Sequence, residues 1–365
     1  MLKIKDLTQY LDKVAPPAYK ESYDNVGLLV GTPQEEITGV LVSLDVTEEV
    51  VEEAAQLGCN LIVSHHPIIF KGLKRLTGAN YVERTVMLAL QKGVRLYASH
   101  TNLDNVHTGV NRKIADKLGL QNPQVLAPKG ETLQKLVTYI PTEHTQQVMD
   151  AVHAAGAGHI GNYSHCSFRV VGEGTFLPEE GANPTLGERG RLETVNENRV
   201  EVMFPAHLQR SILAALKEAH PYEEVAYYLH TTENLNQELG SGMIGTLPEP
   251  LEGTVFLDYL KDKMELPALR HTPLPNRPIQ RVAVCGGAGS FLIHAARGAG
   301  ADAYITGDVK YHEFFDAEGK MVIADIGHYE SEVFTKDLLA DIIREKFPNI
   351  AVRLSQVVTN PLKYY

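Results

Sequence analysis

His65 and His66 stand next to each other in the string Ser64-His65-His66-Pro67, directly after the apolar run 61–63. Adjacent imidazoles at the end of a buried strand need hydrogen-bond partners or a metal ion, because burying an unpaired polar group is costly. Successive residues of a strand point to opposite faces, so both rings reach one site only if the chain turns here, as Pro67 favours. Taken alone, such a pair is more often structural or exposed than metal-binding.

Asp104 belongs to a second polar cluster, residues 100–105, which again follows an apolar run, residues 94–98. Its carboxylate is able to bridge two cations, and His100 is a candidate ligand or a donor that orients a ligand. A polar loop with Asx turns is the alternative, and for this cluster alone it is the better interpretation.

His328 and Glu332 form a third cluster, after the apolar run 321–324 and at the start of a long amphipathic pattern, residues 330–346. Residues four apart share one face of a helix, so this pair is suited to clamp a metal ion. The alternative is an exposed helix start, where acidic residues are favoured, and Glu330 fits that role.

The three clusters carry more weight together than separately, because each follows a predicted parallel strand and one side of a sheet gathers such strand ends. Three histidines and two carboxylates suit Zn²⁺, Mn²⁺, Fe²⁺ or Co²⁺ better than Ca²⁺. Five protein ligands exceed the usual three of a mononuclear catalytic zinc, so the set favours two ions bridged by a carboxylate or water. The sequence therefore predicts two divalent metal ions per chain, with zinc as first choice, held by His65, His66, Asp104, His328 and Glu332.

Two other segments carry weaker signals. The string Cys285-Gly286-Gly287-Ala288-Gly289-Ser290 lies between an expected strand and an expected helix, where glycines let backbone N–H groups approach an anion. It lacks the lysine of a Walker loop and departs from GxGxxG, so a tight turn explains it at least as well as a phosphate site. Thr306-Gly307-Asp308 is a candidate for acid–base or supporting groups, but a helix N-cap at Asp308 is the better interpretation.

The elements that must position these residues alternate between strand and helix in the first and last parts of the chain. This alternation predicts an α/β architecture with parallel or mixed sheets. Residues 58–65 and 300–307 share one layout: a glycine that ends a helix, a polar step, an apolar strand and a hydroxyl residue. We interpret this as a weak internal duplication that makes two α/β lobes with a cleft between them.

The middle of the chain follows a different order, in which strand–helix–strand occurs twice and the order strand, proline, helix recurs at Pro141 and Pro205. This order predicts an inserted ferredoxin-like α+β domain. Linker-like composition flanks it at 127–130 and 231–242. We therefore expect a discontinuous two-lobed α/β core, residues 1–127 and 239–365, and an inserted domain, residues 128–238.

Composition argues against several classes of protein. The 365 residues carry a formal net charge of −11 and no dense basic stripe, which disfavours a general nucleic-acid binder. No apolar run approaches the ~20 residues of a membrane span, and the first residues have no signal-peptide core. The three cysteines lie far apart without a CxxC pair, which is typical of the reducing cytosol, so we expect a cytoplasmic location.

Several strings in the two outer parts of the chain form an ordered set of motifs. They are Asp24-Asn25-Val26-Gly27-Leu28, Ser64-His65-His66-Pro67, His100-Thr101-Asn102-Leu103-Asp104, residues 282–290 (VAVCGGAGS), Ile305-Thr306-Gly307-Asp308, Gly327-His328 and Thr359-Asn360-Pro361. In the same order, these strings resemble those of the GTP cyclohydrolase 1 type 2 homologues, also called the NIF-three-like proteins, and the resemblance covers roughly residues 1–127 and 239–365. Tyr23 stands where this family typically has tryptophan, which leaves the metal site untouched.

The resemblance implies that the five predicted ligands hold a dinuclear site between the two lobes. It also implies a toroidal homohexamer whose sites face the interior. The end of the insert, residues 220–224 (HPYEE), is similar to PII- and CutA-like domains, which trimerise. In such an assembly we expect the insert to cap the toroid.

Two functional hypotheses follow. In the first, the protein is a metal-dependent hydrolase of a nucleotide-like or phosphate-bearing small molecule, which either opens the ring of GTP or cleaves a phosphoester. In the second, it is a metal- or metabolite-binding sensor or scaffold that acts on a protein partner through the PII-like insert, and saturable binding without turnover distinguishes it. A third, DNA-associated regulation through the hole of the toroid, is disfavoured by the net charge of −11.

Overall fold

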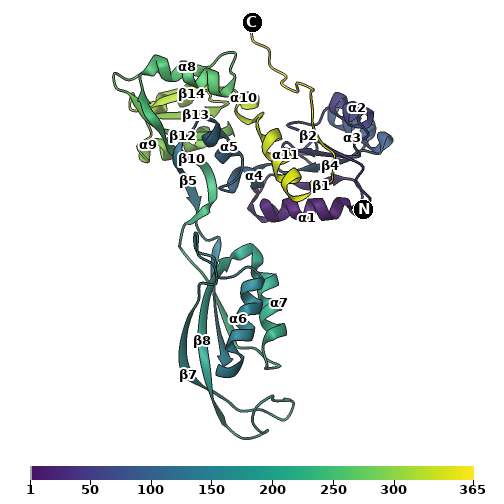
Figure 1. The fold of residues 1–365 in the computed structure, drawn as a ribbon, viewed down its shortest axis with the longest axis vertical. Coiled ribbons are helices and arrows are strands. Elements are labelled where there is room, and N and C mark those ends of the chain that lie inside the picture. Colours follow the sequence, from purple (N-terminus) through teal and green to yellow (C-terminus); the bar gives the residue numbers. More distant parts are fainter. Residues whose placement is uncertain (1) are drawn as a thin grey trace. The chain divides into compact units, whose positions relative to one another are not determined.

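The computed structural model describes residues 2–365, which form two compact units (Figure 1). The first unit comprises Met1–Pro128 and Gln237–Tyr365, and the second comprises Lys129–Asn236. No helix within residues 2–365 is both long and apolar enough to cross a lipid bilayer. Each unit contains its own sheet structure and hydrophobic core.

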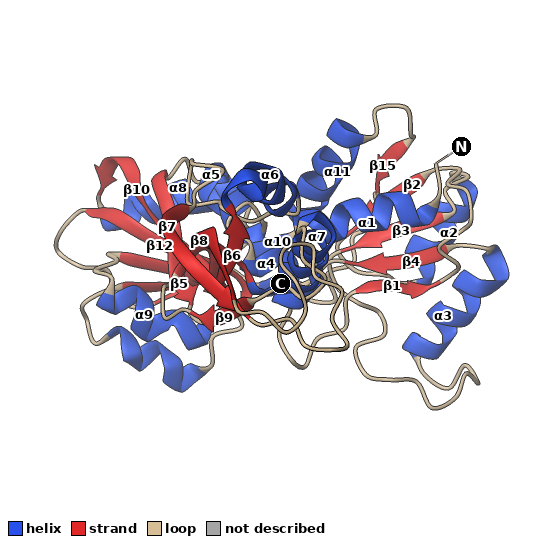
Figure 2. Cartoon of the chain, turned by 90° about the horizontal axis from the view of Figure 1, so that it is seen from below, coloured by secondary structure: helices blue, strands red, loops and turns tan. Residues whose placement is uncertain are grey.

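A five-stranded sheet of order β1-β4-β3-β2-β15 forms the first lobe of the first unit. Strands β15, β2, β3 and β4 run parallel, and β1 pairs antiparallel with β4 (Figure 2). Every residue of β2 and β3 is buried, as expected for parallel strands covered on both faces. The strands are β1 (Gly27–Val30), β2 (Val40–Ser43), β3 (Leu61–Ser64), β4 (Arg95–Ala98) and β15 (Val352–Leu354).

Helices cover both faces of this sheet. Successive strand residues point to opposite faces, so alternate residues pack with different helices. Leu41 and Ile62 pack with α2 and α3, whereas Val42 and Val63 pack in a cluster with α1, α5 and α11. The side chain of Thr47 caps the start of α2. The helices are α1 (Ile4–Val14), α2 (Glu48–Gln56), α3 (Tyr81–Lys92), α4 (Thr101–Asn105), α5 (Val110–Lys117) and α11 (Thr335–Lys346).

A six-stranded sheet of order β11-β14-β13-β12-β10-β5 forms the second lobe. Strands β12, β13 and β14 are parallel, and the antiparallel strands β11 and β10 flank them. Helix α8 packs with one face of this sheet and α9 with the other. These elements are β5 (Gln121–Lys129), β10 (Asn236–Leu251), α8 (Gly253–Met264), β11 (Arg270–His271), β12 (Ile279–Ala288), α9 (Ile293–Gly298), β13 (Ala303–Gly307), β14 (Val322–Asp325) and α10 (His328–Glu332).

The two sheets of the first unit share a plan. In each, parallel strands lie in a row and an antiparallel strand flanks the last of them: β15-β2-β3-β4 with β1, and β12-β13-β14 with β11. The strands of the repeated segments, β3 and β13, both lie directly before the last parallel strand of their row. Gly58 and Gly300, which precede them, both adopt a left-handed backbone. The sheets therefore have the similar plan that the repeated sequence layout predicted.

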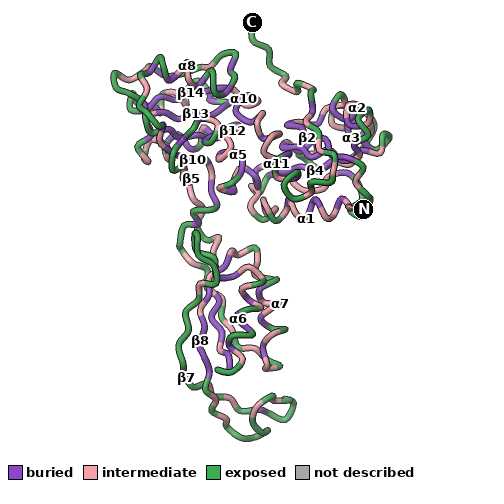
Figure 3. Tube along the Cα trace, in the orientation of Figure 1, coloured by how far each residue is buried: buried purple, intermediate pink, exposed green. Residues whose placement is uncertain are grey.

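The second unit is a four-stranded antiparallel sheet of order β7-β8-β6-β9 with two helices. Its elements follow the order strand–helix–strand, strand–helix–strand that the sequence predicted. Alternate residues of β6 and β8, such as Leu136 and Val202, pack with both helices, whereas β7 is exposed along most of its length (Figure 3). The elements are β6 (Leu133–Pro141), α6 (Thr145–Ala154), β7 (Phe168–Phe176), β8 (Glu193–Pro205), α7 (Gln209–Ala219) and β9 (Tyr227–Thr231).

Three segments differ from the sequence-based expectation. Residues 127–129 end β5 and residues 236–242 begin β10, where linkers were expected, because β5 and β10 are neighbours in the six-stranded sheet. The single helix expected over 330–346 consists of two helices, α10 and α11. Only the first of these, α10, carries the predicted site residues.

Gly109 sets the turn between α4, which carries Asp104, and α5. A Cβ atom at this position would lie 1.7 Å from the carbonyl oxygen of Leu103, so no other residue fits without moving the backbone. We expect Gly109→Ala to lower the free energy of unfolding by about 1–3 kcal/mol or more, because overpacking forces the backbone to shift. Urea denaturation followed by circular dichroism measures this change.

Gly298→Ala is the matched control, since Gly298 lies at the end of α9 with open space around the position of a Cβ atom. Alanine there should be neutral or slightly stabilising, because it restricts the unfolded chain. Equal stabilities of the two variants would contradict the packing described for the α4–α5 turn.

Candidate metal centre

His65 and His66 reach the same site because the chain turns directly after β3. The Ser64 hydroxyl donates to the His66 carbonyl oxygen at 2.9 Å, which closes the turn. The two imidazole rings consequently lie with their centroids 4.9 Å apart rather than on opposite faces of the sheet. His65 is fully buried, and His66 is partly exposed.

Each of three histidines in this site uses its Nδ1 atom to contact a fixed oxygen. A backbone carbonyl only accepts, so the contact to Ser99 places the proton of His65 on Nδ1 and leaves Nε2 as an acceptor. Such contacts hold the ring and its tautomer, as they do for histidines in metal sites. The distances are 2.8 Å from His65 to the Ser99 carbonyl, 2.7 Å from His66 to Asp45 Oδ1 and 2.8 Å from His328 to Asp308 Oδ2.

Glu332 lies at the centre of these rings and is almost fully buried. Its Oε2 atom is 3.0 Å from His66 Nε2 and 3.1 Å from His328 Nε2, while its Oε1 atom is 3.8 Å from His65 Nε2. The two carboxylate oxygens therefore face different histidines. His328 and Glu332 share one face of α10, as their spacing of four residues predicted.

Two buried atoms of the site have no hydrogen-bond partner: Nε2 of His65 and Oδ1 of Asp104, which lie 3.5 Å apart. Unpaired polar atoms are rare in protein interiors, and each one needs a physical reason. Here both are electron-pair donors pointing at the same place, and imidazole nitrogen with carboxylate oxygen is a donor set that divalent transition metals accept. The residues therefore fit a metal ion.

Three overlapping groups of ligand atoms could hold a metal ion within the described residues. All five residues that the sequence predicted are brought together in them, and His100 is added. The groups are His65, His66 and His100; His66, His328 and Glu332; and His65, Asp104 and Glu332.

The ionisation of the two carboxylates is pushed in opposite directions. Burial alone would raise the pKa of Glu332, but contacts from His328, His65 and His66 outweigh it and hold that pKa well below its usual range. Burial raises the pKa of Asp104 well above its usual range, and the nearby Glu332 carboxylate adds to the rise. Positive charge from a cation is what would keep both carboxylates ionised together.

His66 and His328 respond to the same negative charges. Burial lowers the pKa of His66, but Asp45 and Glu332 reverse this and raise it to about 10. For His328, burial is likewise overcome by Glu332 and Asp308, which raise its pKa to about 9. Both rings therefore carry a proton near neutral pH unless a metal ion takes its place, and metal binding here releases protons.

His100 lies beside this group, with its ring centroid 5.2 Å from that of His65. Its Nδ1 atom is 2.9 Å from Asp24 Oδ1, and the other Asp24 oxygen accepts hydrogen bonds from the backbone and hydroxyl of Thr101. Burial opposes ionisation of Asp24, but these contacts lower its pKa well below the usual range. Asp24 is thus a fixed anion that orients His100.

Three carboxylates orient histidines of the site, those of Asp24, Asp45 and Asp308, and the sequence raised a supporting role only for Asp308, as the less favoured interpretation. Asp45 follows β2, at the same end of the sheet as His65 follows β3, so the strand-end rule that located the histidines could also have located it. Asp308 was interpreted as a helix N-cap, which is wrong: it has a left-handed backbone (φ 56°), and its carboxylate contacts His328. The next helical turn begins at Tyr311, after Lys310.

The glycine-rich loop, residues 285–289, lies at the irregular end of β12, where the pairing with β13 shifts register, and it packs against the site. A Cβ atom on Gly287 would lie 2.4 Å from Glu332 Oε1, so glycine is required for the carboxylate to occupy its position. Three backbone N–H groups of the loop already donate within the protein, which leaves them unavailable to a phosphate. The acceptors are Asn111 Oδ1 for Gly286, Ser331 Oγ for Gly287 and Thr306 Oγ1 for Gly289.

Comparison with known proteins places this geometry in a family. A family model described as Duf34/NIF3 (NGG1p interacting factor 3) matches residues 2–361. The chain belongs to the Duf34/NIF3 family. A protein of Bacillus subtilis named GTP cyclohydrolase 1 type 2 homolog is 37% identical over 365 residues, covering 99% of this chain and 98% of that protein. A protein of Halalkalibacterium halodurans with the same name is 40% identical over 363 residues, 98% of this chain and 97% of that protein.

Two solved structures have the same fold as this chain. A crystal structure of a Bacillus cereus protein related to NIF3 matches with a TM-score of 0.87 and 38% identity, covering 100% of this chain and 99% of that chain. A Staphylococcus aureus protein matches with a TM-score of 0.79 and 32% identity over 100% of this chain and 99% of that chain. The mixed α/β architecture predicted from the sequence is therefore that of the Duf34/NIF3 fold.

The contact between Asp45 and His66 gives a test of the centre that leaves every candidate ligand in place. We expect Asp45→Asn to weaken retention of a divalent metal ion by about 10–100-fold, because an amide holds the imidazole less well than a carboxylate does. Competition with a chelator, followed by mass-spectrometric metal analysis, measures the change. Asp258→Asn, an exposed position on α8, is the control and should retain metal as the wild type does.

Proposed function

We propose that this Duf34/NIF3 protein holds two divalent metal ions and hydrolyses a nucleotide-like or phosphate-bearing small molecule. The observation that carries the proposal is the position of Glu332. Its Oε2 atom faces His66 and His328, and its Oε1 atom faces His65, whose neighbour is Asp104. The groups His66, His328, Glu332 and His65, Asp104, Glu332 share only the Glu332 carboxylate and would hold one ion each, which supports a pair of ions.

The donor set supports zinc as the first choice, with manganese, iron or cobalt as alternatives. Imidazole nitrogen and carboxylate oxygen suit all four, whereas calcium prefers oxygen alone. Two divalent ions held by these residues would lower the pKa of a water and provide positive charge for an oxyanion of the substrate. The number of protein ligands, five and with His100 six, supports a pair rather than a single ion.

Residues of the chain contribute positioning around the centre. Asp45, Asp308 and the Ser99 carbonyl oxygen hold the Nδ1 atoms of the three central rings. Asp24 fixes His100 through Nδ1, so Nε2 is the atom of this partly exposed ring that would serve either as a sixth ligand or, where it holds no metal, as a proton acceptor for the substrate. The remaining groups around the centre bind and orient.

The proposed substrate class rests on the positive charge of two metal ions at the centre and on the names of the relatives. Two metal ions attract an anion, which a phosphate-bearing molecule provides. The relatives of Bacillus subtilis and Halalkalibacterium halodurans are both named GTP cyclohydrolase 1 type 2 homolog. Ring opening of GTP is therefore one form of the proposal, and cleavage of a simple phosphoester is the other.

The second unit supports a further part of the proposal. Its strand order, β7-β8-β6-β9, with helices after the first and third strands, supports a ferredoxin-like domain similar to PII- and CutA-like domains. We propose that this insert serves assembly, that the protein is a homohexamer in the cytoplasm, and that its partners are small molecules rather than membranes or nucleic acid. The net charge of −11 supports the last point.

A non-catalytic sensor remains the second candidate function. A cavity of about 430 Å³ within the insert favours it, because a binding module needs a ligand site of its own. A sensor of this kind binds a metal or metabolite and releases it unchanged.

Metal content and turnover, measured on the same samples purified without chelator, distinguish the two candidates. We expect the wild type to contain two divalent ions per chain and to hydrolyse GTP or a simple phosphodiester. His65→Ala should lose most of the metal and reduce turnover by about 10²-fold or more, since it removes a ligand between Asp104 and Glu332. His294→Ala, an exposed histidine of α9, should behave as the wild type.

Each result of these metal and turnover measurements supports a different conclusion. Bound metal without turnover of GTP, phosphodiesters or phosphomonoesters would favour the sensor. Turnover that survives in His65→Ala would contradict the assignment of hydrolysis to this centre. Absence of metal from wild-type protein would contradict the proposed function itself.

A further inference from the structure

The insert contains a hollow that neither the metal centre nor the proposed hydrolysis uses. Its volume is about 430 Å³, within the range of small-molecule sites. Strands β6, β7 and β8 form one side, and segment 178–186 and the turn 222–226 form the other. We call it the acidic hollow.

Hydrogen bonds hold the far wall of the acidic hollow in place. The backbone N–H of Asn183 donates to Glu223 Oε1 at 2.7 Å, and the Thr185 hydroxyl donates to the Pro221 carbonyl oxygen at 2.7 Å. Segment 178–186 is thereby attached to the turn that follows α7. The hollow is a built feature of the unit rather than a gap beside a free loop.

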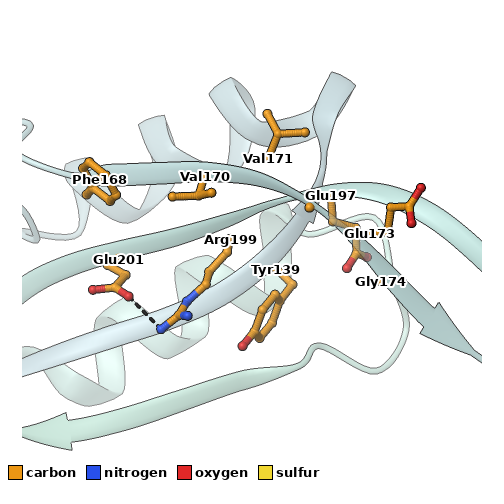
Figure 4. Close-up of a pocket in the computed structure, with 10 residues that line it drawn as sticks. Tyr139, Phe168, Val170, Val171, Glu173, Gly174, Glu197, Arg199 and Glu201 are labelled. Atoms are coloured by element: carbon orange, nitrogen blue, oxygen red, sulfur yellow. Dashed lines mark ion pairs between the residues drawn. The ribbon is translucent and has the colours of Figure 1, made fainter.

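Four carboxylates line the acidic hollow, those of Glu173, Glu197, Glu223 and Glu224, and no lysine, arginine or histidine lines it. A neighbouring hollow of about 400 Å³ shares Glu173 and Glu197 with it (Figure 4). The cation that lines the neighbour, Arg199, pairs with Glu201 at 2.8 Å, so its charge is already engaged there. The electrostatic potential in this region favours a cation.

Among the four carboxylates of the acidic hollow, Glu197 indicates a bound cation most strongly. Its exposed fraction is only 8%, and within residues 2–365 no ion pair to lysine, arginine or histidine neutralises it. Buried charges in proteins are normally paired, so an unpaired one that lines a cavity points to a missing partner. A Cβ atom on Gly174 would lie 2.2 Å from Glu197 Oε2, so the opposite strand carries glycine where this carboxylate needs room.

The nearby His220 does not provide the missing charge. Burial lowers its pKa, although the backbone of Tyr139 and the charge of Glu197 oppose the shift. Its Nε2 atom lies 2.9 Å from the Tyr139 carbonyl oxygen, and its Nδ1 atom accepts from the backbone N–H of Tyr222. The imidazole is therefore neutral near pH 7, with both nitrogens already used.

Aromatic and apolar side chains make up the rest of the lining. Phe176 and Tyr222 pack with ring centroids 5.9 Å apart, and Tyr139 lines the same hollow. Aromatic faces attract cations, most strongly where water is excluded. Pro178, Pro184 and Leu186 add apolar surface for an uncharged portion of a ligand.

The arrangement suits an organic cation better than a metal ion. Within the described residues, no three of these carboxylates bring oxygen atoms within 4.8 Å of one another, as the ligands of the metal centre do. Negative charge spread along an apolar cavity matches an ammonium or guanidinium group on a carbon body, since such a group also makes several hydrogen bonds.

We propose that the acidic hollow of the insert binds a small organic cation, a primary amine or guanidinium on an apolar body, with its charged group on Glu197. The site is separate from the metal centre and gives the insert a ligand of its own. Binding there does not depend on whether the protein hydrolyses a phosphate compound.

Isothermal titration calorimetry on the full-length protein, as purified and at physiological salt, tests the proposal with tyramine and agmatine as probes. We expect at least one of them to bind saturably at one site per chain. Glu197→Gln, which keeps the shape and removes the charge, should weaken that binding at least tenfold. The neutral analogue 4-ethylphenol should bind at least tenfold more weakly than tyramine.

Glu218→Gln, on α7 outside the hollow, is the control and should bind as the wild type does. If Glu197→Gln fails to fold by circular dichroism, the double variant Glu173→Gln with Glu224→Gln decides, because both residues are exposed lining positions. Loss of binding in the variant that folds supports the proposal. Absence of saturable binding by both probes, equal binding of 4-ethylphenol, or equal loss in Glu218→Gln would overturn it.

Discussion

A single carboxylate, that of Glu332, is buried among three imidazoles where the two lobes of the first unit meet. A buried carboxylate is unfavourable unless positive charge or hydrogen-bond donors surround it. Protons on His66 and His328, or bound cations, supply that charge. The requirement ties α10 of the second lobe to the end of β3 in the first, and the surrounding structure is arranged around it.

The lobes meet this requirement through the ends of parallel strands. His65 and His66 follow β3, Asp45 follows β2, and Asp308 follows β13. Strand β3 of the first sheet and strand β13 of the second both end at this group of side chains, since His65 and His66 follow the one and Asp308 follows the other. Gly287 lacks the Cβ atom that would displace Glu332, and its N–H is engaged by Ser331, so the backbone of the second lobe approaches the carboxylate closely.

Much of this was accessible from the sequence because the signals were local. Residue type, spacing and position after an apolar run were enough to select His65, Asp104 and Glu332, and the alternation of strand and helix indicated the sheets. The strand-end rule places Asp45 and Asp308 near the site, but it does not indicate which histidine each of them orients. The break between α10 and α11 was also missed, because the apolar periodicity continues through it.

The acidic hollow could not be predicted from the sequence either. Its carboxylates come from β7, β8 and the turn after α7, and nothing in their sequence separation indicates that they gather around one cavity. Residues 220–224 (HPYEE) indicated a PII- or CutA-like domain but did not indicate a ligand. Only the pairing of β7 with β8, which sets Gly174 against the side chain of Glu197, brings the unpaired charge to the cavity.

Anomalous diffraction from crystals of the protein purified without chelator, collected at the absorption edges of zinc, manganese, iron and cobalt, tests the two-ion centre most directly. We expect two anomalous peaks, one reached by His66, His328 and Glu332 and the other by His65, Asp104 and Glu332. No peak among these side chains, or a single ion that leaves Nε2 of His65 and Oδ1 of Asp104 without a partner, would contradict the bridging role of Glu332.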